Sequence, residues 1–293
     1  MLSYAAPLTV EEAISILASA SGPAKVLSGG TDLLVQLRSG RSKPGLIVDI
    51  KRIPGISGIR ERDGAFVIGA ATPGAVIGEC EALRQAWPGV VEAANLIGST
   101  QVQGRATLAG NLCNASPAAD SVPALYAAAA IAVIVGPNGK REVPVEQVPT
   151  GPGRTSLAKG EFILEFKLPP RPAHSSDAYL RFIPRTEMDI AVVGCGISVT
   201  LDAGGTCTAA RVSLGAVAPT VLLVKAAADA LIGHKLDDAT LAKLDAAAQA
   251  ACKPIDDKRG TIVYRTKVAG VLARRVAAIA FDRAMGKAHA RTH

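Results

Sequence analysis

The spacing of hydrophobic and polar positions changes several times along the first 55 residues, and each change predicts a new element. An amphipathic run over 10–18 follows Thr9, and Glu12 stands three residues after Thr9, which is the pattern of a capped helix. A compact apolar strand at 24–28 leads into Gly29-Gly30 and then into a helical segment that stops at Gly40. A further buried strand is expected at 46–50.

The middle of the chain mixes strands and helices. A turn at Asp63-Gly64 introduces a strand at 66–70, and Thr72-Pro73 opens a helical region. Helical composition extends over 75–83 and 90–97. The following segment, 98–111, has no helical periodicity, and its small and polar residues predict turns. The remaining expectations are a helix over 123–130, a hairpin of 131–135 with 141–145, and a strand over 161–168. If 107–120 is only a polar loop without a ligand, it would cap a helix from near Pro117, with Ser116 as the N-cap.

The C-terminal part follows a polar, proline-containing link at 171–178. Three runs at 179–185, 190–202 and 207–217 predict a three-stranded antiparallel sheet, with a tight turn at 202–205. From Thr220 the chain is alanine-rich and helical in three pieces, and Pro254 separates the second from the third. The fold class is therefore α+β, with one domain over 1–174, in subdomains of about 1–55 and 56–174, and a smaller one over 175–293.

Composition narrows the class of protein. The 293 residues carry a formal charge of +7, are 49% hydrophobic and include only one Trp, four Tyr and five Phe. Because basic residues do not alternate with aromatic ones, nucleic-acid binding is not expected. The longest apolar stretch, 122–135, contains Pro123 and is too short to span a membrane. No secretion signal is visible at the N-terminus, so a cytoplasmic location is expected.

Cysteines and histidines offer no metal site. The five cysteines include no C-x-x-C pair, which leaves reduced thiols as the simplest interpretation. The four histidines lack metal-ligand spacing, and no acid–base pair suggests a catalytic residue. If the chain takes part in catalysis, a bound cofactor is expected to do the chemistry. The histidines are His174, His234, His289 and His293.

The segment VLSGGTDLL at 26–34 places two glycines between a strand and a helix. Glycine tolerates positive φ and lets a ligand approach the backbone, and the amides of Gly30, Thr31 and Asp32 would point together, as an anion-binding site requires. A diphosphate would fit such a turn. The alternative is an ordinary strand-to-helix turn without a ligand.

A second candidate element is TLAGN at 107–111. Its hydroxyl and amide groups, with Asn114, Ser116 and Asp120 beyond it, offer partners for a ribityl chain, a ribose or a phosphate. The alternative is a polar loop that caps the next helix. Neither element matches G-x-G-x-x-G, and GCG at 194–196 continues as a strand, so a Rossmann site is not expected.

Taken together, these blocks resemble the FAD-binding medium subunit of the molybdenum hydroxylases, the xanthine dehydrogenase and carbon monoxide dehydrogenase group. VLSGGTDLL is similar to the family's first diphosphate motif, and RATLAGNLCNASPAADSVPAL at 105–125 is similar to its T-I-G-G-N block with the following A-S-P-x-x-D. RTEMDIAVVG at 185–194 resembles the segment that opens the family's C-terminal domain. The resemblance extends over essentially the whole chain.

The resemblance implies a fold and a set of cofactor contacts. The fold is a two-subdomain FAD domain of the vanillyl-alcohol-oxidase (PCMH) type, followed by a smaller domain with a three-stranded sheet and a helical bundle. The family's second glycine is Ala109 here, which would crowd the diphosphate slightly. The implied FAD-binding residues are Val26, Leu27, Ser28, Gly29, Gly30, Thr31, Asp32, Leu33, Ile97, Thr107, Leu108, Ala109, Gly110, Asn111, Asn114, Asp120, Ile163 and Arg181.

The resemblance also implies an activity and partners. The chain would be the FAD-carrying oxidoreductase subunit of a heterotrimer, assembled as a dimer of heterotrimers with a large molybdenum-pterin subunit and a small subunit that holds two [2Fe–2S] clusters. The absence of cluster-type cysteines here agrees, because clusters need thiolate ligands. The alternatives are a stand-alone FAD oxidoreductase of the same fold and a flavin-free scaffold. Neither the molybdenum subunit's substrate nor the electron acceptor can be identified from the residues.

Overall fold

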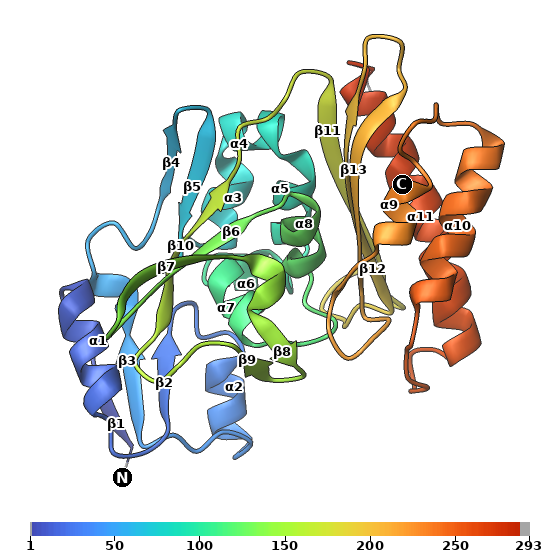
Figure 1. The fold of residues 1–293 in the computed structure, drawn as a ribbon. Coiled ribbons are helices and arrows are strands. Elements are labelled where there is room, and N and C mark those ends of the chain that lie inside the picture. The colour runs from blue at the N-terminus through green and yellow to red at the C-terminus, as the bar shows by residue number, and fades with distance from the viewer. Residues whose placement is uncertain (1, 288–293) are drawn as a thin grey trace.

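The structure is a computed structural model that describes residues 2–287. Its N-terminal layer is a parallel sheet in the order β1-β3-β2, with helices α1 and α2 beside it (Figure 1). The cap of α1 forms as expected, because the Thr9 hydroxyl accepts the Glu12 N–H at 3.1 Å and the Glu12 carboxylate accepts the Leu8 N–H at 2.8 Å. The elements are β1 (Ser3–Ala5), α1 (Val10–Ser19), β2 (Ala24–Leu27), α2 (Leu33–Arg38) and β3 (Leu46–Asp49).

The second layer is an antiparallel sheet in the order β4-β5-β10-β6-β7, with short helices packed beside it. Its strands are β4 (Ile59–Arg62), β5 (Ala65–Gly69), β6 (Ile131–Gly136), β7 (Gly139–Pro144) and β10 (Phe162–Leu168). The helices are α3 (Gly74–Glu79), α4 (Glu81–Ala86), α5 (Pro88–Ala94), α6 (Thr100–Gln103), α7 (Leu108–Cys113) and α8 (Ser121–Ala127). A small hairpin of β8 (Pro149–Gly151) and β9 (Arg154–Thr155), and the 3₁₀ turns Ile50–Arg52 and Val145–Gln147, complete this part.

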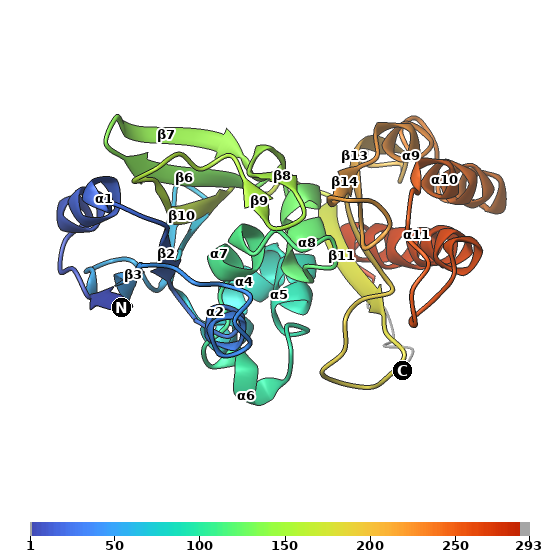
Figure 2. The ribbon, with the colours of Figure 1, turned by 90° about the horizontal axis from the view of Figure 1, so that it is seen from below.

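The third layer is an antiparallel sheet in the order β11-β12-β13-β14. Helices α5 and α8 pack on one face and α11 covers the other, with α9 and α10 alongside (Figures 1 and 2). The three expected strands are present, and a two-residue strand, β14, extends the sheet beyond them. The elements are β11 (Ser175–Phe182), β12 (Val193–Leu201), β13 (Cys207–Gly215), β14 (Leu222–Leu223), α9 (Lys225–Asp229), α10 (Asp238–Ala251) and α11 (Ile262–Ala284).

Buried apolar side chains form two separate cores. One fills the space between the first two layers and their helices, and the other lies between the third sheet and α11. Helix α8 joins them, because it packs closely on β12: a Cβ on Gly196 would lie 2.7 Å from the carbonyl oxygen of Pro123. The GCG sequence therefore serves helix–sheet packing rather than a nucleotide.

Two stretches differ from the sequence-based expectation. The segment 98–111, expected to be non-helical, contains α6 and the start of α7, which are too short to show a helical period. The helix expected over 123–130 is α8, which begins slightly earlier, at Ser121, and the alternative start near Pro117 is not observed. Asn111 explains the start at Ser121, because its side-chain carbonyl accepts both the N–H and the hydroxyl of Ser121, at 3.0 and 2.7 Å. Ser116 only closes a local turn with Ala118.

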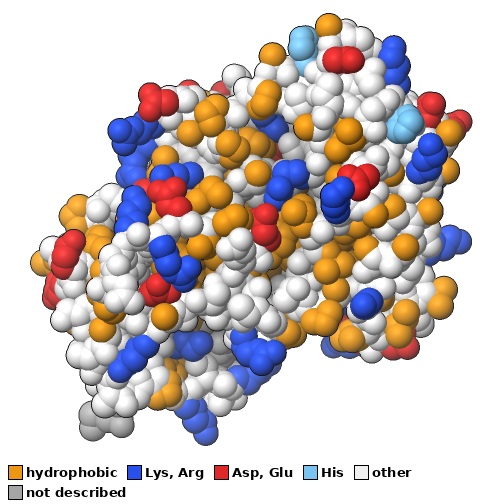
Figure 3. Space-filling view, in the orientation of Figure 1, with side chains coloured by type: hydrophobic (Ala, Val, Ile, Leu, Met, Phe, Trp, Pro, Cys, Tyr) orange, Lys and Arg blue, Asp and Glu red, His pale blue; other side chains and the backbone are white. Residues whose placement is uncertain are grey.

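Charged side chains of both signs are interspersed with hydrophobic ones on the face that Figure 3 shows. Within residues 2–287, no helix combines the length and the apolar character that crossing a membrane requires. Several charges are instead buried where the second and third layers meet.

One such charge is Asp177 on β11, which is 1% exposed. Arg171 pairs with it and also lies over the Trp87 ring, with its guanidinium carbon 3.7 Å from the ring centroid. Burial raises the pKa of Asp177 in spite of this partner. A second buried pair joins Arg181 on β11 to Asp120 before α8, at 2.9 Å.

Replacing Arg171 with Met is expected to lower the free energy of unfolding by about 3–5 kcal/mol, because it removes the ion-pair partner of the buried Asp177 carboxylate. Urea unfolding of the full chain measures this loss. The double variant Arg171→Met/Asp177→Asn should recover part of it, and Lys225→Met, which breaks an exposed pair with Asp229, should change little. If the single and double variants lost equal stability, the loss could not be assigned to the unpaired Asp177 carboxylate.

The pair of Asp120 and Arg181 predicts a pH-dependent stability. Burial raises the pKa of Asp120 to about 6, above its ordinary value of 3.8. Between these two values the folded chain holds a proton that the unfolded chain releases, so stability falls as pH rises from about 4 to 6. The measured quantity is the difference in free energy of unfolding between the wild type and Asp120→Asn. We expect this difference to fall by roughly 3 kcal/mol over that range and then to level off. A difference that does not change with pH would contradict the raised pKa of the buried Asp120 carboxyl.

Candidate functional site

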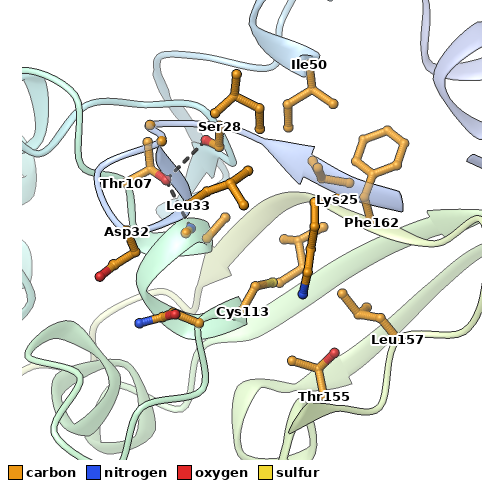
Figure 4. A pocket seen from close by; sticks show the side chains of 18 of the residues that line it. Lys25, Ser28, Asp32, Leu33, Ile50, Thr107, Cys113, Thr155, Leu157 and Phe162 are labelled. Carbon is orange, nitrogen blue, oxygen red and sulfur yellow. Dashed lines mark hydrogen bonds between the residues drawn. The ribbon is translucent and has the colours of Figure 1, made fainter. Parts of the chain in front are cut away.

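A cavity of about 540 Å³ lies between the first two layers. Most of its wall is formed by three segments, 22–36, 106–114 and 153–163. The wall is completed by Leu17, Ile50 and Ile97. The cavity thus opens where β2 leads into α2 and where α7 begins, so both candidate elements of the sequence face the same space (Figure 4). Its volume is in the range of small-molecule and cofactor sites.

The Gly29-Gly30 turn is shaped by two different constraints. A Cβ on Gly29 would overlap the carbonyl oxygen of Arg105, so the turn touches the segment before α7 backbone to backbone. Gly30 has φ +79°, a conformation that L side chains rarely adopt. Together they turn the chain sharply from β2 into α2.

The turn leaves donors without partners. Within the described chain, no protein acceptor lies within hydrogen-bond distance of the N–H groups of Gly30, Thr31 and Asp32. The carbonyls of Gly30 and Asp32 are engaged by α2, since Gly30 accepts the Leu34 N–H at 3.0 Å and Asp32 accepts that of Gln36 at 2.9 Å. Successive free N–H groups next to a cavity form a favourable site for an anion.

Hydroxyl groups join the two elements directly. The Ser28 hydroxyl lies 3.1 Å from that of Thr107 and donates to the Ala70 carbonyl at 3.0 Å. Thr107 also accepts the Gly110 N–H at 3.0 Å, which caps α7 (Figure 4). Ser28, Ala70 and Thr107 are buried, so the two elements are held at a fixed distance.

Two asparagines, one on α7 and one at its C-cap, contribute amide groups. The carbonyl of Asn111 is committed to Ser121, and that of Asn114 accepts the Gln36 amide at 2.9 Å. No acceptor in the part of the chain that the structure describes takes up either NH₂ group. Each asparagine therefore offers donors to a molecule in the cavity.

Most of the residues singled out from the sequence line this cavity. Leu108, Asp120 and Arg181 do not: Leu108 is buried beneath the start of α7, and the other two pair with each other in the second buried pair. The residues in the wall are Val26, Leu27, Ser28, Gly29, Gly30, Thr31, Asp32, Leu33, Ile97, Thr107, Ala109, Gly110, Asn111, Asn114 and Ile163.

Other lining residues were not anticipated. Lys25 and Cys113 lie close to the candidate motifs in the sequence, whereas Thr155, Leu157 and Phe162 come from a distant segment with no recognisable motif. Only the pairing of β10 in the second sheet, and the β8–β9 hairpin before it, bring that segment to the wall.

The cavity contains few ionisable groups. Burial raises the pKa of the Asp32 carboxyl and raises that of the Cys113 thiol to about 12, although nearby Lys25 opposes the shift at Cys113. Glu161 is held by Arg141 through two contacts of 2.8 Å. Among residues 2–287 no cluster of His, Cys, Asp and Glu could hold a metal ion. His289 and His293 lie outside the described residues.

Comparisons with known families assign this architecture. Residues 1–171 match the family described as the FAD binding domain in molybdopterin dehydrogenase, and residues 178–280 match the CO dehydrogenase flavoprotein C-terminal domain. The carbon monoxide dehydrogenase medium chain of Hydrogenophaga pseudoflava is 33% identical over 96% of this chain and 97% of its own length. A putative xanthine dehydrogenase FAD-binding subunit of Escherichia coli K12 is 31% identical over 97% of this chain and 98% of that protein.

Solved structures agree with the sequence relatives. Carbon monoxide dehydrogenase from H. pseudoflava superposes with a TM-score of 0.92 at 34% identity, over 96% of this chain and 98% of that one. Quinoline 2-oxidoreductase from Pseudomonas putida 86 gives a TM-score of 0.89 at 26% identity, over 97% and 98% of the two chains. Relatives of this length and similarity are named dehydrogenases, which identifies an oxidoreductase. The chain belongs to the family of FAD-binding medium subunits of the molybdenum hydroxylases.

Proposed function

We propose that this chain is the electron-transfer subunit of a heterotrimeric molybdenum hydroxylase, and that it passes electrons from the [2Fe–2S] clusters of a partner subunit through FAD to an external acceptor. The observation that carries the proposal is the cavity in which unpartnered N–H groups of Gly30, Thr31 and Asp32 face the Thr107 element. A site of this kind suits a ligand with a diphosphate at its centre.

The residues present fit FAD. The N–H groups of the glycine turn would bind the diphosphate, and Thr107 to Asn111 would close over it. Ala109 lines the cavity from within α7 but is only 6% exposed, so its methyl group adds little to the surface that a diphosphate would meet. The asparagine NH₂ groups would donate to the ribityl or ribose hydroxyls, and Ile97 and Ile163 would exclude water from the ring system.

The three singled-out residues outside the wall would act indirectly. Leu108 supports the first turn of α7, and Arg181 fixes Asp120, which directly precedes Ser121 and therefore the bond to Asn111. When bound, FAD supplies one- and two-electron redox chemistry that protein side chains lack. We propose no catalytic residue in this chain: its own groups bind, orient and shield the flavin.

The partners follow from the family. Relatives are named as a "medium chain" and as a "complex subunit", which supports a large subunit with a molybdenum-pterin cofactor and a small subunit with two [2Fe–2S] clusters. We propose a dimer of such heterotrimers in the cytoplasm. We also propose a division of this chain into an FAD domain, 1–174, and a C-terminal domain, 175–293, which the two family matches support.

A stand-alone FAD oxidoreductase and a flavin-free scaffold are the competing functions. Reduction of the isolated chain by a small organic substrate would favour the first, and a colourless chain that ignores added FAD would favour the second. Neither has a specific observation in its favour here.

Gly30→Val is expected to abolish flavin binding, because a β-branched residue opposes φ +79° and its Cβ would lie 2.8 Å from the Leu27 side chain. The absorption spectrum of the purified chain, with chromatography of the released flavin, should give about one FAD per wild-type chain and none in the variant. Gly233→Val is a matched control, since Gly233 has φ +83° but lies away from the cavity with open space around it. A Gly30→Val chain that keeps a full complement of FAD would refute the site.

Purification of the native assembly tests the partners. We expect molybdenum and about four iron atoms per chain to copurify with the flavin, because two [2Fe–2S] clusters contribute four irons. Elemental analysis of the complex, with the tagged chain alone as control, measures both. A flavoprotein that purifies from its native source without iron or molybdenum would support the stand-alone oxidoreductase instead.

A further inference from the structure

Helix α2, which begins just after the glycine turn, presents two different faces. One faces the cavity, because Leu33 and Gln36 are part of the wall. The other faces solvent: Leu34 and Val35 are 49% and 60% exposed, and none of the six residues of α2 is buried. Figure 1 shows α2 at the lower side of the molecule, away from the third layer. Adjacent apolar side chains on a surface helix leave area in water that a partner protein would cover.

The exposed side of α2 lies immediately outside the glycine turn. A Cβ on Gly30 would be 3.5 Å from the Leu34 side chain, so Leu34 packs against this turn. Arg105 also meets the turn, because its carbonyl oxygen contacts the Gly29 backbone. A protein that docks on this side of α2 therefore comes within a few side chains of a cofactor in the cavity.

Unpaired cations surround these apolar side chains. Arg38 follows Leu34 by four residues and Val35 by three, which places the three on one side of the helix. Two more cations follow in the loop to β3, and a fourth lies at the glycine turn. All four are exposed, and no carboxylate in residues 2–287 lies within ion-pair distance of them. We define the α2 face as Leu34, Val35, Arg38, Arg41, Lys43 and Arg105.

A second group of exposed apolar side chains lies on the third layer, around Phe182 and Tyr264, whose ring centroids are 6.0 Å apart. This group does not line the cavity. The arginines near it are already paired, because Arg185 and Arg259 both bind Asp189. It therefore lacks the two features that distinguish the α2 face, which are nearness to the cavity and positive charge without an internal partner.

The complement of the α2 face is an acidic protein surface with an apolar centre. A [2Fe–2S] cluster held by Cys thiolates carries a net negative charge, and its electrons pass to a flavin only when the two groups lie close together. Unpaired cations attract such a partner and have no ion pairs to break when it binds. We propose that the α2 face is the docking surface for the iron–sulfur subunit, with Leu34 and Val35 at its centre. This inference rests on the proposed function, because it assumes that such a subunit donates electrons to this chain.

Photo-crosslinking in the purified native complex tests which partner covers the α2 face. With Val35→p-benzoylphenylalanine, irradiation should join this chain to the subunit that holds the Cys-bound clusters, as identified by mass spectrometry. The matched control is Val76→p-benzoylphenylalanine, because Val76 on α3 is 41% exposed and outside the cavity wall, and it should give no such product. Crosslinking of position 35 to the large subunit, to a second copy of this chain or to no subunit would overturn the inference.

Charge reversal tests the electrostatic part. The double variant Arg38→Glu/Arg41→Glu should raise the dissociation constant of the iron–sulfur subunit about 10- to 100-fold, measured from the iron-to-flavin ratio of the complex over a dilution series. FAD should stay near one per chain, because neither arginine lines the cavity. Arg275→Glu changes an exposed arginine on α11 and should behave as the wild type.

The outcomes separate the inference from the proposed function. An unchanged iron-to-flavin ratio in the double variant, or an equal loss of iron in Arg275→Glu, would contradict the docking surface. A wild-type complex that purifies with flavin but without iron would instead refute the proposed function.

Discussion

The cavity depends on the contact between the Gly29 backbone and the carbonyl of Arg105. That contact brings a turn from the parallel layer against a helix start from the antiparallel layer, and a side chain at position 29 would push the two apart. The Ser28 and Thr107 hydroxyls, 3.1 Å apart and buried, hold the same junction from within. Both layers therefore contribute to one binding surface.

Charge is distributed unevenly around this junction. The parts that face the cavity carry few ionisable groups, and the important donors there are backbone N–H groups that cannot titrate. Largely buried ion pairs are found elsewhere, where β11 meets the helices of the second layer: Arg171 with Asp177, and Arg181 with Asp120. A site built from amides keeps its preference for anions at any physiological pH, whereas the layer junction responds to acid through its carboxyls.

Much of this fold could be predicted from the sequence, because many of its elements are determined by patterns of residues that lie close together along the chain. The capped helix after Thr9, the glycine turn, the hairpin and the three long C-terminal strands each have a signal within about 15 residues. The start of α8 could not be predicted in the same way, since its cap is a side chain from α7 ten residues earlier rather than Ser116. Asp120 and Arg181 were singled out by resemblance, yet burial and their mutual charge keep them out of the wall. Thr155, Leu157 and Phe162 were missed because only the pairing of distant strands brings them there.

Asn111 has a consequence for the mobility of the chain. Asn111 lines the cavity, while its side-chain carbonyl holds the first residue of α8, and α8 in turn packs on β12 and β13. A ligand that fixes Asn111 therefore restrains the fraying of α8, and the backbone amide of Ser121 should exchange with solvent more slowly when the cavity is filled. Through this single amide, the occupancy of the cavity is linked to the rigidity of the surface between the second and third layers.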